Sequence, residues 1–237
     1  MLFRTDAYLR DAEAVVQAHT DEGGVILDRS VFYATGGGQP GDAGQIEWSG
    51  GALGVATAVK GQGDQIVLVP SEPRPLPPVG TRVMQQLDWE RRYAHMRVHT
   101  ALHLLSVAMP FGVTGGSISA ARGRLDFDME DAPEDKAAIE DALAALVEAD
   151  HVVSETWITE DELDANPGLV KTLSVQPPRG AGRIRLVRIG AEDAPVDLQP
   201  CGGTHVARTG EIGGLRLGKI EKKGRRNRRG YLHLEAT

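Results

Sequence analysis

The pattern of apolar and polar residues in the first third of the chain predicts short β-strands. Apolar or alternating runs, separated by turns rich in glycine, aspartate and serine, occupy residues 23–33, 44–48, 53–61 and 65–70. This spacing is typical of a small antiparallel barrel or sandwich. Residues 70–80 contain five prolines and cannot lie within a helix or a central strand. They form a stiff connection, either between two domains or between two strands of the barrel.

From Asp88 onward the period of the apolar positions changes to that of a helix. Residues 89–110 have helical spacing and end at Pro110, and a second amphipathic pattern covers residues 133–151, opened by Pro133 and the acids after it. Further runs predict strands at 117–130, 183–190, 212–224 and 228–235, with a strand and a short helix between 157 and 170. We therefore predict an α+β fold. Its parts are a β-barrel-like domain at 1–88 and a domain at 89–237 with helices packed on an antiparallel sheet.

The composition is that of an ordinary folded protein. The 237 residues are 41% hydrophobic and 25% charged, and no apolar run approaches the roughly 18 residues of a transmembrane helix. The first residues carry acids where a secretory signal needs a basic region, so we expect a cytoplasmic protein with no membrane partner. The single cysteine, Cys201, cannot form a disulfide within the chain. It is a buried small residue, a metal ligand or a nucleophile.

Charge is distributed unevenly along the chain. Residues 130–164 contain thirteen acids and one base, whereas residues 216–229 contain eight bases and one acid. Both segments are compatible with solvated faces. In a protein whose net charge is −7, the basic segment also indicates a site for a polyanion, which phosphate contacts would hold with a salt-sensitive affinity.

Four residues have the spacing of metal ligands. His99 and His103 are four residues apart in a predicted helix and project from the same face. Cys201 and His205 are four apart across a Gly-Gly turn that permits a tight bend. Each pair alone is also compatible with buried core residues. Together they supply three imidazoles and one thiolate, a set that suits tetrahedral zinc, and we predict one zinc ion per chain.

Two further features of the sequence are candidates for roles beside the metal ligands. Asp197, four residues before Cys201, either orients a metal ligand or caps the turn. The segment from Thr35 to Gln39 contains Gly36, Gly37 and Gly38 and lacks the Gly-Lys-Ser/Thr ending of a phosphate-binding loop. It is either a flexible hairpin or a fixed turn that exposes backbone N–H groups, with Thr35 or Gln39 as polar contacts to a substrate.

Three motifs together resemble the free-standing AlaX proteins, which are similar to the editing domain of alanyl-tRNA synthetase. They are FYATGGGQPGDAG at 32–44, VHTALHLL at 98–105 and QPCGGTHVARTGEIG at 199–213. The resemblance covers essentially the whole chain, and the N-terminal part places it with the medium-length class of the family. The two ligand pairs alone are shared with the editing domain of threonyl-tRNA synthetases; the glycine-rich and CGGTH motifs favour the alanine family.

The resemblance implies hydrolysis of the ester that joins a wrong amino acid to the acceptor end of alanine tRNA. The wrong amino acid would be serine, with glycine as a second candidate. The family's metal site corresponds to His99, His103, Cys201 and His205, and Thr35 matches a threonine that senses the serine hydroxyl, with Gly36, Gly37, Gly38 and Gln39 around it. The bases that would grip acceptor-stem phosphates are Lys222, Lys223, Arg225, Arg226, Arg228 and Arg229.

Other functions remain open from the sequence. A threonyl-type editing domain and a non-catalytic, zinc-stabilised RNA-binding module are both compatible with the ligand pairs. A zinc peptidase fits less well, because Thr100 stands where the peptidase motif HExxH has its glutamate. The sequence does not determine the oligomeric state or which group activates water.

Overall fold

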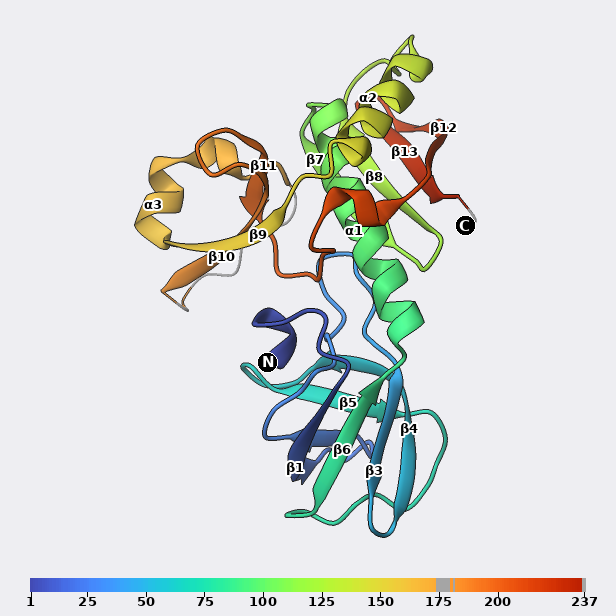
Figure 1. The fold of residues 1–237 in the computed structure, drawn as a ribbon, viewed down its shortest axis with the longest axis vertical. Coiled ribbons are helices and arrows are strands. Elements are labelled where there is room, and N and C mark those ends of the chain that lie inside the picture. Colours follow the sequence, from blue (N-terminus) through green and yellow to red (C-terminus); the bar gives the residue numbers. More distant parts are fainter. Residues whose placement is uncertain (174–179, 181, 236–237) are drawn as a thin grey trace. The chain divides into compact units, whose positions relative to one another are not determined.

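The computed structural model describes residues 1–173, 180 and 182–235 (Figure 1). The chain divides into two compact units, Met1–His95 and Met96–Thr237, with the boundary inside helix α1 (Trp89–Ala108). One unit is a closed antiparallel barrel, and the other combines antiparallel sheets with helices. The prediction of an α+β fold is therefore confirmed.

The first unit is a six-stranded closed barrel with the strand order β1-β2-β5-β4-β3-β6. Its strands are β1 (Asp11–His19), β2 (Val25–Leu27), β3 (Gly44–Trp48), β4 (Gly51–Lys60), β5 (Ile66–Pro70) and β6 (Arg82–Leu87), preceded by a 3₁₀ turn, η1 (Leu2–Arg4). Alternate strand residues fill its interior, among them Val16, Val25, Ile46, Leu53 and Leu68, and Phe32 from the loop after β2 joins them. The proline-rich residues 71–81 connect β5 to β6, so they join two barrel strands.

Two barrel strands, β1 and β6, were not predicted from the apolar pattern. Strand β6 has Gln85 at a fully buried position, where a strand pattern calls for an apolar side chain. The side chain is satisfied inside the barrel, because its Oε1 accepts from Val31 N at 3.1 Å and its Nε2 donates to Arg29 O at 3.3 Å. A buried polar side chain that has hydrogen-bond partners is compatible with the fold, although it interrupts the alternation of apolar and polar residues along the strand.

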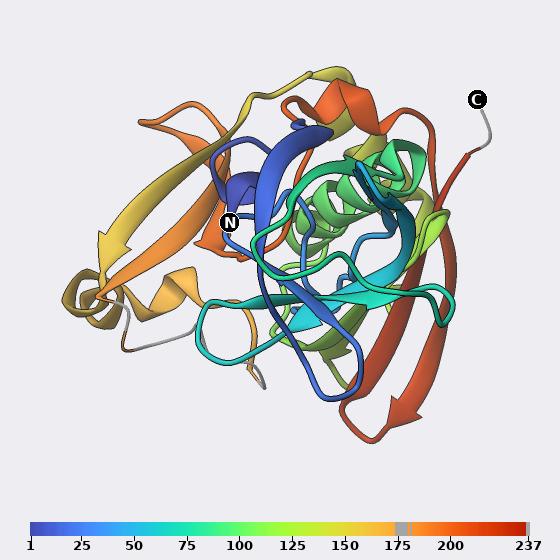
Figure 2. The same cartoon turned by 90° about the horizontal axis from the view of Figure 1, so that it is seen from below.

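The described part of the second unit contains two antiparallel sheets. The four-stranded sheet has the order β12-β13-β8-β7, and the three-stranded sheet has the order β11-β10-β9. Their strands are β7 (Val113–Ile118), β8 (Arg122–Asp128), β9 (Val153–Thr159), β10 (Arg183–Gly190), β11 (Pro195–Pro200), β12 (Leu215–Gly224) and β13 (Asn227–Leu234). Figure 2 shows β12 and β13 as the long red hairpin. The single strand predicted at 117–130 is instead a hairpin of β7 and β8, which pair with each other.

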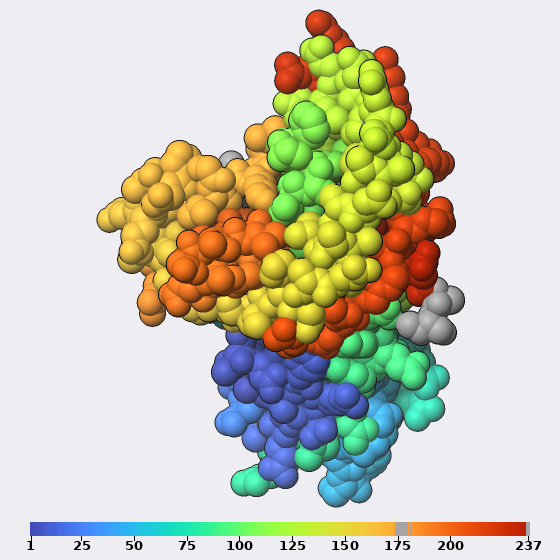
Figure 3. Space-filling model, turned by 45° about the horizontal axis from the view of Figure 1, so that its top comes forward, coloured from blue at the N-terminus to red at the C-terminus, as the bar shows by residue number. Residues whose placement is uncertain are grey.

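Helices cover these sheets. Helix α2 (Lys136–Glu148) begins three residues after Pro133, because Asp135 caps it by accepting from Ala138 N at 2.9 Å. The carboxylate of Glu140 on α2 accepts from Leu217 N of β12 at 3.0 Å, and the two elements adjoin on the face shown in Figure 3. The remaining short helices are α3 (Glu160–Ala165), η2 (Pro167–Leu169) and η3 (Thr209–Ile212).

The second half of helix α1 packs closely on β8. A Cβ atom at Gly123 would lie 2.7 Å from a Val98 methyl group and 2.9 Å from a Leu102 methyl group. Glycine at this position therefore allows the helix that carries His99 and His103 to approach the sheet.

Among the described residues, no helix is long and apolar enough to span a membrane.

Candidate metal centre and its surroundings

The structure brings together all four residues that the sequence singled out as metal ligands. His99 and His103 come from α1, and Cys201 and His205 come from the segment after β11. Their ligand atoms all lie within 4.8 Å of one another. Cys201 Sγ is 3.4 Å from His99 Nε2 and 3.3 Å from His205 Nε2. These distances fit a common metal ion, because Zn–S and Zn–N bonds of about 2.3 and 2.0 Å place tetrahedral ligand atoms about 3.3–3.6 Å apart.

The hydroxyl of Thr100 determines which ring nitrogen of His205 carries the hydrogen. Thr100 Oγ1 donates to Met96 O at 3.0 Å and lies 3.1 Å from His205 Nδ1. Since a hydroxyl has one hydrogen, Thr100 accepts a hydrogen bond from Nδ1–H of His205. The lone pair of Nε2 in that tautomer points toward the Cys201 sulfur, where a metal would bind.

A carboxylate holds His103 in the corresponding way. Asp197 Oδ2 accepts a hydrogen bond from Nδ1–H of His103 at 2.8 Å, so Nε2 is the ring nitrogen that can bind a metal. Gln199 Nε2 donates to the same oxygen at 2.7 Å, and Lys171 Nζ is 2.6 Å from Oδ1. Of the two roles open to Asp197 from the sequence, the structure shows the one that orients a ligand.

Burial and charge set the protonation of these groups. Burial raises the pKa of the Cys201 thiol, but His99 and His205 outweigh it, and the pKa lies well below the ordinary thiol value. Burial lowers the pKa of His205 to about 3. Burial also lowers the pKa of His103, but the hydrogen bonds to Asp197 and Cys201 and the charges of both groups outweigh this and raise the pKa to about 9. A metal that binds Nε2 of His103 would therefore displace a proton. The site therefore favours the thiolate, the form of cysteine that binds metals.

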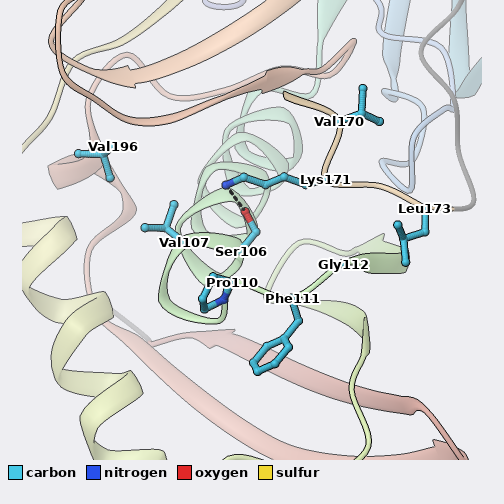
Figure 4. Close-up of a pocket in the computed structure, with 9 residues that line it drawn as sticks. All are labelled: Ser106, Val107, Pro110, Phe111, Gly112, Val170, Lys171, Leu173 and Val196. Atoms are coloured by element: carbon cyan, nitrogen blue, oxygen red, sulfur yellow. Dashed lines mark hydrogen bonds between the residues drawn. The ribbon is translucent and has the colours of Figure 1, made fainter. Parts of the chain in front are cut away.

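A pocket of about 410 Å³ is lined by Lys171, the residue that contacts Asp197, and by Ser106 of α1 (Figure 4). Lys171 reaches across it, with Nζ 3.4 Å from Ser106 Oγ. Phe111 and Leu173 at this pocket are 43% and 54% exposed. The other lining residues are Val107, Pro110, Gly112, Val170 and Val196. Lys171 thus connects an open, mostly apolar pocket to the carboxylate that holds His103.

The glycine-rich segment of the barrel unit forms a fixed turn. Gly36 N donates to Gln39 O at 3.1 Å, and Gln39 N donates to Gly36 O at 2.9 Å. Gly37 and Gly38 have φ angles of +57° and +83°, which is the signature of a type I′ turn. Both glycines are exposed, whereas Gln39 is buried.

Thr35 lies at the base of this turn with its side chain held in place. Its Oγ1 donates to Ala58 O at 3.2 Å and accepts from Gly41 N at 2.9 Å. Tyr33 stabilises the turn, because its hydroxyl donates a hydrogen bond to Gly36 O at 2.8 Å. One lone pair of the Thr35 hydroxyl remains for a further donor.

The basic segment predicted to bind phosphates is the β12–β13 hairpin. Arg228 is buried and donates to Gly224 O at 3.0 Å, so it holds the hairpin turn. Arg229 forms a two-pronged pair with Asp126 at 2.6 and 2.9 Å.

The remaining predicted cations are exposed at the hairpin end. Arg226 pairs with Asp128 at 3.1 Å, and Lys223 pairs with Glu221 at 2.8 Å. Lys222 and Arg225 are exposed, and neither forms an ion pair within the described part of the chain.

Thr100, Lys171, Gln199 and Arg185 around the metal ligands were not found from the sequence. Thr100 and Gln199 are ordinary polar residues in their local patterns. Lys171 and Arg185 come from segments distant in sequence from the residues they contact. Only the packing of α1, β10 and β11 reveals their roles.

Comparison with family models defines the class to which this fold and centre belong. Residues 184–230 match the second additional domain of threonyl and alanyl tRNA synthetases, and residues 5–91 match the class II (A) tRNA synthetases. The first match contains Cys201 and His205 and the basic hairpin, and the second contains the barrel with its glycine-rich turn. The chain thus combines two domains of the kind found in class II tRNA synthetases.

Whole-chain relatives identify the family within this class. The chain is 34% identical to the alanyl-tRNA editing protein AlaX-M of Methanosarcina acetivorans, over 99% of this chain and 98% of that protein. It is 38% identical to the alanine–tRNA ligase of Pyrobaculum arsenaticum, over 93% of this chain but only 25% of the ligase. Its match to AlaX-L of Pyrococcus horikoshii, at 32% identity, covers 54% of that protein. The chain belongs to the AlaX family of alanyl-tRNA editing proteins and has the length of its medium class.

Proposed function

We propose that this protein hydrolyses the ester of mischarged alanine tRNA, with serine as its main substrate and glycine as a second one. The observation that carries this proposal is the three-histidine, one-cysteine cluster in a chain of the AlaX family. Water would add to the ester carbonyl and the bond to the ribose oxygen would break. The products would be the free amino acid and intact tRNA with its hydroxyl restored. The reaction would take place in the cytoplasm, where tRNA is charged.

Selectivity explains why a separate hydrolase is needed. A synthetase site built for alanine cannot exclude the smaller glycine, and an apolar pocket rejects an added hydroxyl by only about 10²-fold. A second site can instead require the hydroxyl and thereby spare correctly charged alanine. When an alanine ester binds, the group that senses the hydroxyl would be left without a partner. A buried group left unpaired in this way costs about 1–3 kcal/mol, which is enough to discriminate against alanine.

Thr35 is our candidate for the group that senses the hydroxyl. Its own hydrogen goes to Ala58 O, and Gly41 N occupies one of its lone pairs. Thr35 can therefore accept a hydrogen bond from the serine hydroxyl without giving up a partner. The turn formed by Gly36, Gly37, Gly38 and Gln39 holds it in place.

We propose zinc as the resident metal. The donor set of three imidazoles and one thiolate suits zinc, and the Sγ to Nε2 distances of 3.4 and 3.3 Å match a tetrahedral ion. When bound, zinc supplies a Lewis acid that can anchor or polarise the aminoacyl group. The residues of the chain hold the ligands in the required form: Thr100 and Asp197 keep the Nδ1 protons of His205 and His103 occupied.

The hairpin end is our candidate for the acceptor-stem contact. Lys222, Lys223, Arg225 and Arg226 are exposed there and close together in sequence, whereas Arg228 is buried. Cations at such a position bind phosphates without reading sequence. They would bring the tRNA end to the protein.

Deacylation of purified alanine tRNA, charged separately with serine, glycine and alanine, tests this function. We expect wild-type protein to release serine and to spare alanine. Glycine has no hydroxyl to sense, so it should be released more slowly than serine. His99→Ala should abolish release, whereas His19→Ala, at an exposed barrel position, should retain it. Threonine tRNA charged with serine serves as a further substrate and tests the threonyl-type alternative. Folded, zinc-loaded protein that releases none of the three amino acids from alanine tRNA would contradict the proposal.

A further inference from the structure

The segment that carries Cys201 and His205 has little regular structure of its own. It follows the last residue of β11 and lies outside helices and strands. Two of its five residues are Gly202 and Gly203. Glycine loses more conformational freedom than any other residue on ordering, so such a segment is costly to hold in one shape. Something outside it must fix its conformation if both ligand atoms are to face the metal.

Arg185 of β10 contacts this segment at three points. Its Nη1 donates to Cys201 O at 2.7 Å and to Gly203 O at 3.0 Å, so both Nη1 hydrogens bind carbonyls of the segment. Its own backbone O accepts from Cys201 N at 3.2 Å. The guanidinium is planar and rigid, so two carbonyls bound to one nitrogen are held at a fixed separation.

The charge of Arg185 is compensated where it is buried. Its side chain is 6% exposed, and Nη2 forms a close ion pair with Glu155 of β9, whose side chain is 35% exposed. A buried guanidinium without such a partner would be strongly destabilising. The arrangement therefore places a stable, pre-oriented donor against the backbone of the ligand segment.

We infer that Arg185 is a positioning residue of the metal centre. It orders the Cys201–His205 segment before metal arrives and so raises metal affinity without touching the metal. This inference rests on the metal site of the proposed function but not on ester hydrolysis.

Metal affinity of the full chain tests the inference directly. We would measure the Kd for Zn²⁺ by competition with a chromophoric chelator and record the visible absorption of the Co²⁺-loaded protein. Arg185→Met should weaken Zn²⁺ binding about tenfold or more, within the range seen for groups that support metal ligands, and should alter the Co²⁺ bands. Arg188→Met is the matched control, because Arg188 lies on the same strand and contacts Ser154 and Glu192 instead.

A second substitution, added to Arg185→Met, distinguishes a loss of order in the Cys201–His205 segment from a general loss of protein stability. Gly202 has a φ outside the left-handed region and open space around its Cβ position, so alanine fits there. Gly202→Ala in the Arg185→Met background should recover about two- to fivefold in metal affinity by restricting the loose segment. A purely global role for Arg185 predicts no such recovery of metal affinity.

The outcomes distinguish this inference from the proposed function. If wild type binds Zn²⁺ and Arg185→Met has the same Kd and the same Co²⁺ spectrum, the inference is wrong while the metal site stands. If wild type binds neither metal, both fail. Should Arg185→Met not fold, Glu155→Gln loosens the same guanidinium from a partly exposed position. It should weaken binding about threefold, and an unchanged Kd there would overturn the inference.

Discussion

Asp197 Oδ2 accepts a hydrogen bond from Nδ1–H of His103, 94 residues away in the sequence, at a distance of 2.8 Å. The carboxylate comes from β11 and the imidazole from α1, so the contact exists only in the folded unit. It fixes the tautomer that leaves Nε2 available to a metal. Gln199 and Lys171 hold the carboxylate in turn, which makes the metal centre part of a larger polar network.

Replacing the carboxylate should weaken the metal centre. We expect Asp197→Ala to reduce Zn²⁺ affinity about 10- to 100-fold, because His103 loses the group that orients its ring. Chelator competition gives the Kd, and Asp193→Ala, at an exposed position before β11, is the control. Equal affinity of the two variants would show that His103 is held adequately without Asp197.

A buried ion pair stabilises the barrel unit. Arg92 and Asp42 are 0% and 1% exposed in their side chains, and Arg92 Nε lies 3.0 and 2.9 Å from the two carboxylate oxygens. Arg92→Met should lower the free energy of unfolding by about 3–5 kcal/mol, since Asp42 is left buried without its partner. Urea unfolding measures this.

The exposed pair of Glu72 and Arg74 is the matched control for that experiment. Both of its side chains are 57% exposed. Arg74→Met should change the free energy of unfolding by less than about 1 kcal/mol. A loss for Arg92→Met as small as the loss for Arg74→Met would mean that Asp42 finds another partner or water.

The glycine-rich turn should tolerate asparagine better than alanine. Gly37 has a φ of +57°, and no atom lies within 4 Å of the point where a Cβ would stand, so only backbone strain opposes a side chain there. Gly37→Ala should cost about 1 kcal/mol in the free energy of unfolding, and Gly37→Asn less, because asparagine adopts left-handed conformations more readily. Thermal unfolding of the two variants compares these costs, and equal midpoints would contradict the turn type.

The stability of the second unit should fall in acid through Asp126. Burial raises the pKa of Asp126, but its pairs with Arg229 and Arg124 outweigh this and lower the pKa below its ordinary value. The unfolded state then binds more protons than the native state below about pH 4, so stability falls as the pH drops through that window.

Asp126→Asn removes this titration. The difference in the free energy of unfolding between wild type and Asp126→Asn should have its largest value at pH 7 and should decrease as the pH falls below about 4. Urea unfolding at pH 7, 4 and 3 measures it. Asp64→Asn, at an exposed loop position, provides the control. A difference that stays constant over this range would exclude Asp126 as the source.

The hairpin end should contribute to tRNA binding through charge alone. Lys222→Ala and Arg225→Ala should each weaken binding of any tRNA similarly and reduce the slope of log affinity against log salt by about 0.7–0.9. Titrations at several salt concentrations measure the slopes. Lys136→Ala, on the acidic helix α2, should leave the slope unchanged. An unchanged slope in the Lys222→Ala, Arg225→Ala double variant would place the acceptor stem elsewhere.

Much of the fold was predictable because its signals are local. Helix α1 was predicted from residues 89–110 and observed at Trp89–Ala108, since apolar spacing and a terminal proline act within a few turns. The strands β3, β5 and β10 were found in the same way. Strand β6 was missed because Gln85 occupies a core position and finds its partners only inside the closed barrel.

The sequence by itself determined the four metal-ligand candidates, because His99 and His103 share a helix face and Cys201 and His205 flank a tight turn. It also placed Asp197 near them in sequence. Only the tertiary structure decided three hydrogen bonds: Asp197 with His103, Thr100 with His205, and Arg185 with the backbone of the Cys201–His205 segment. The first two contacts join residues 94 and 105 positions apart, and the third joins residues 16 apart. The geometry of all three depends on how α1, β10 and β11 pack. A local pattern specifies which residue types can bind a metal, whereas packing specifies which polar atoms meet.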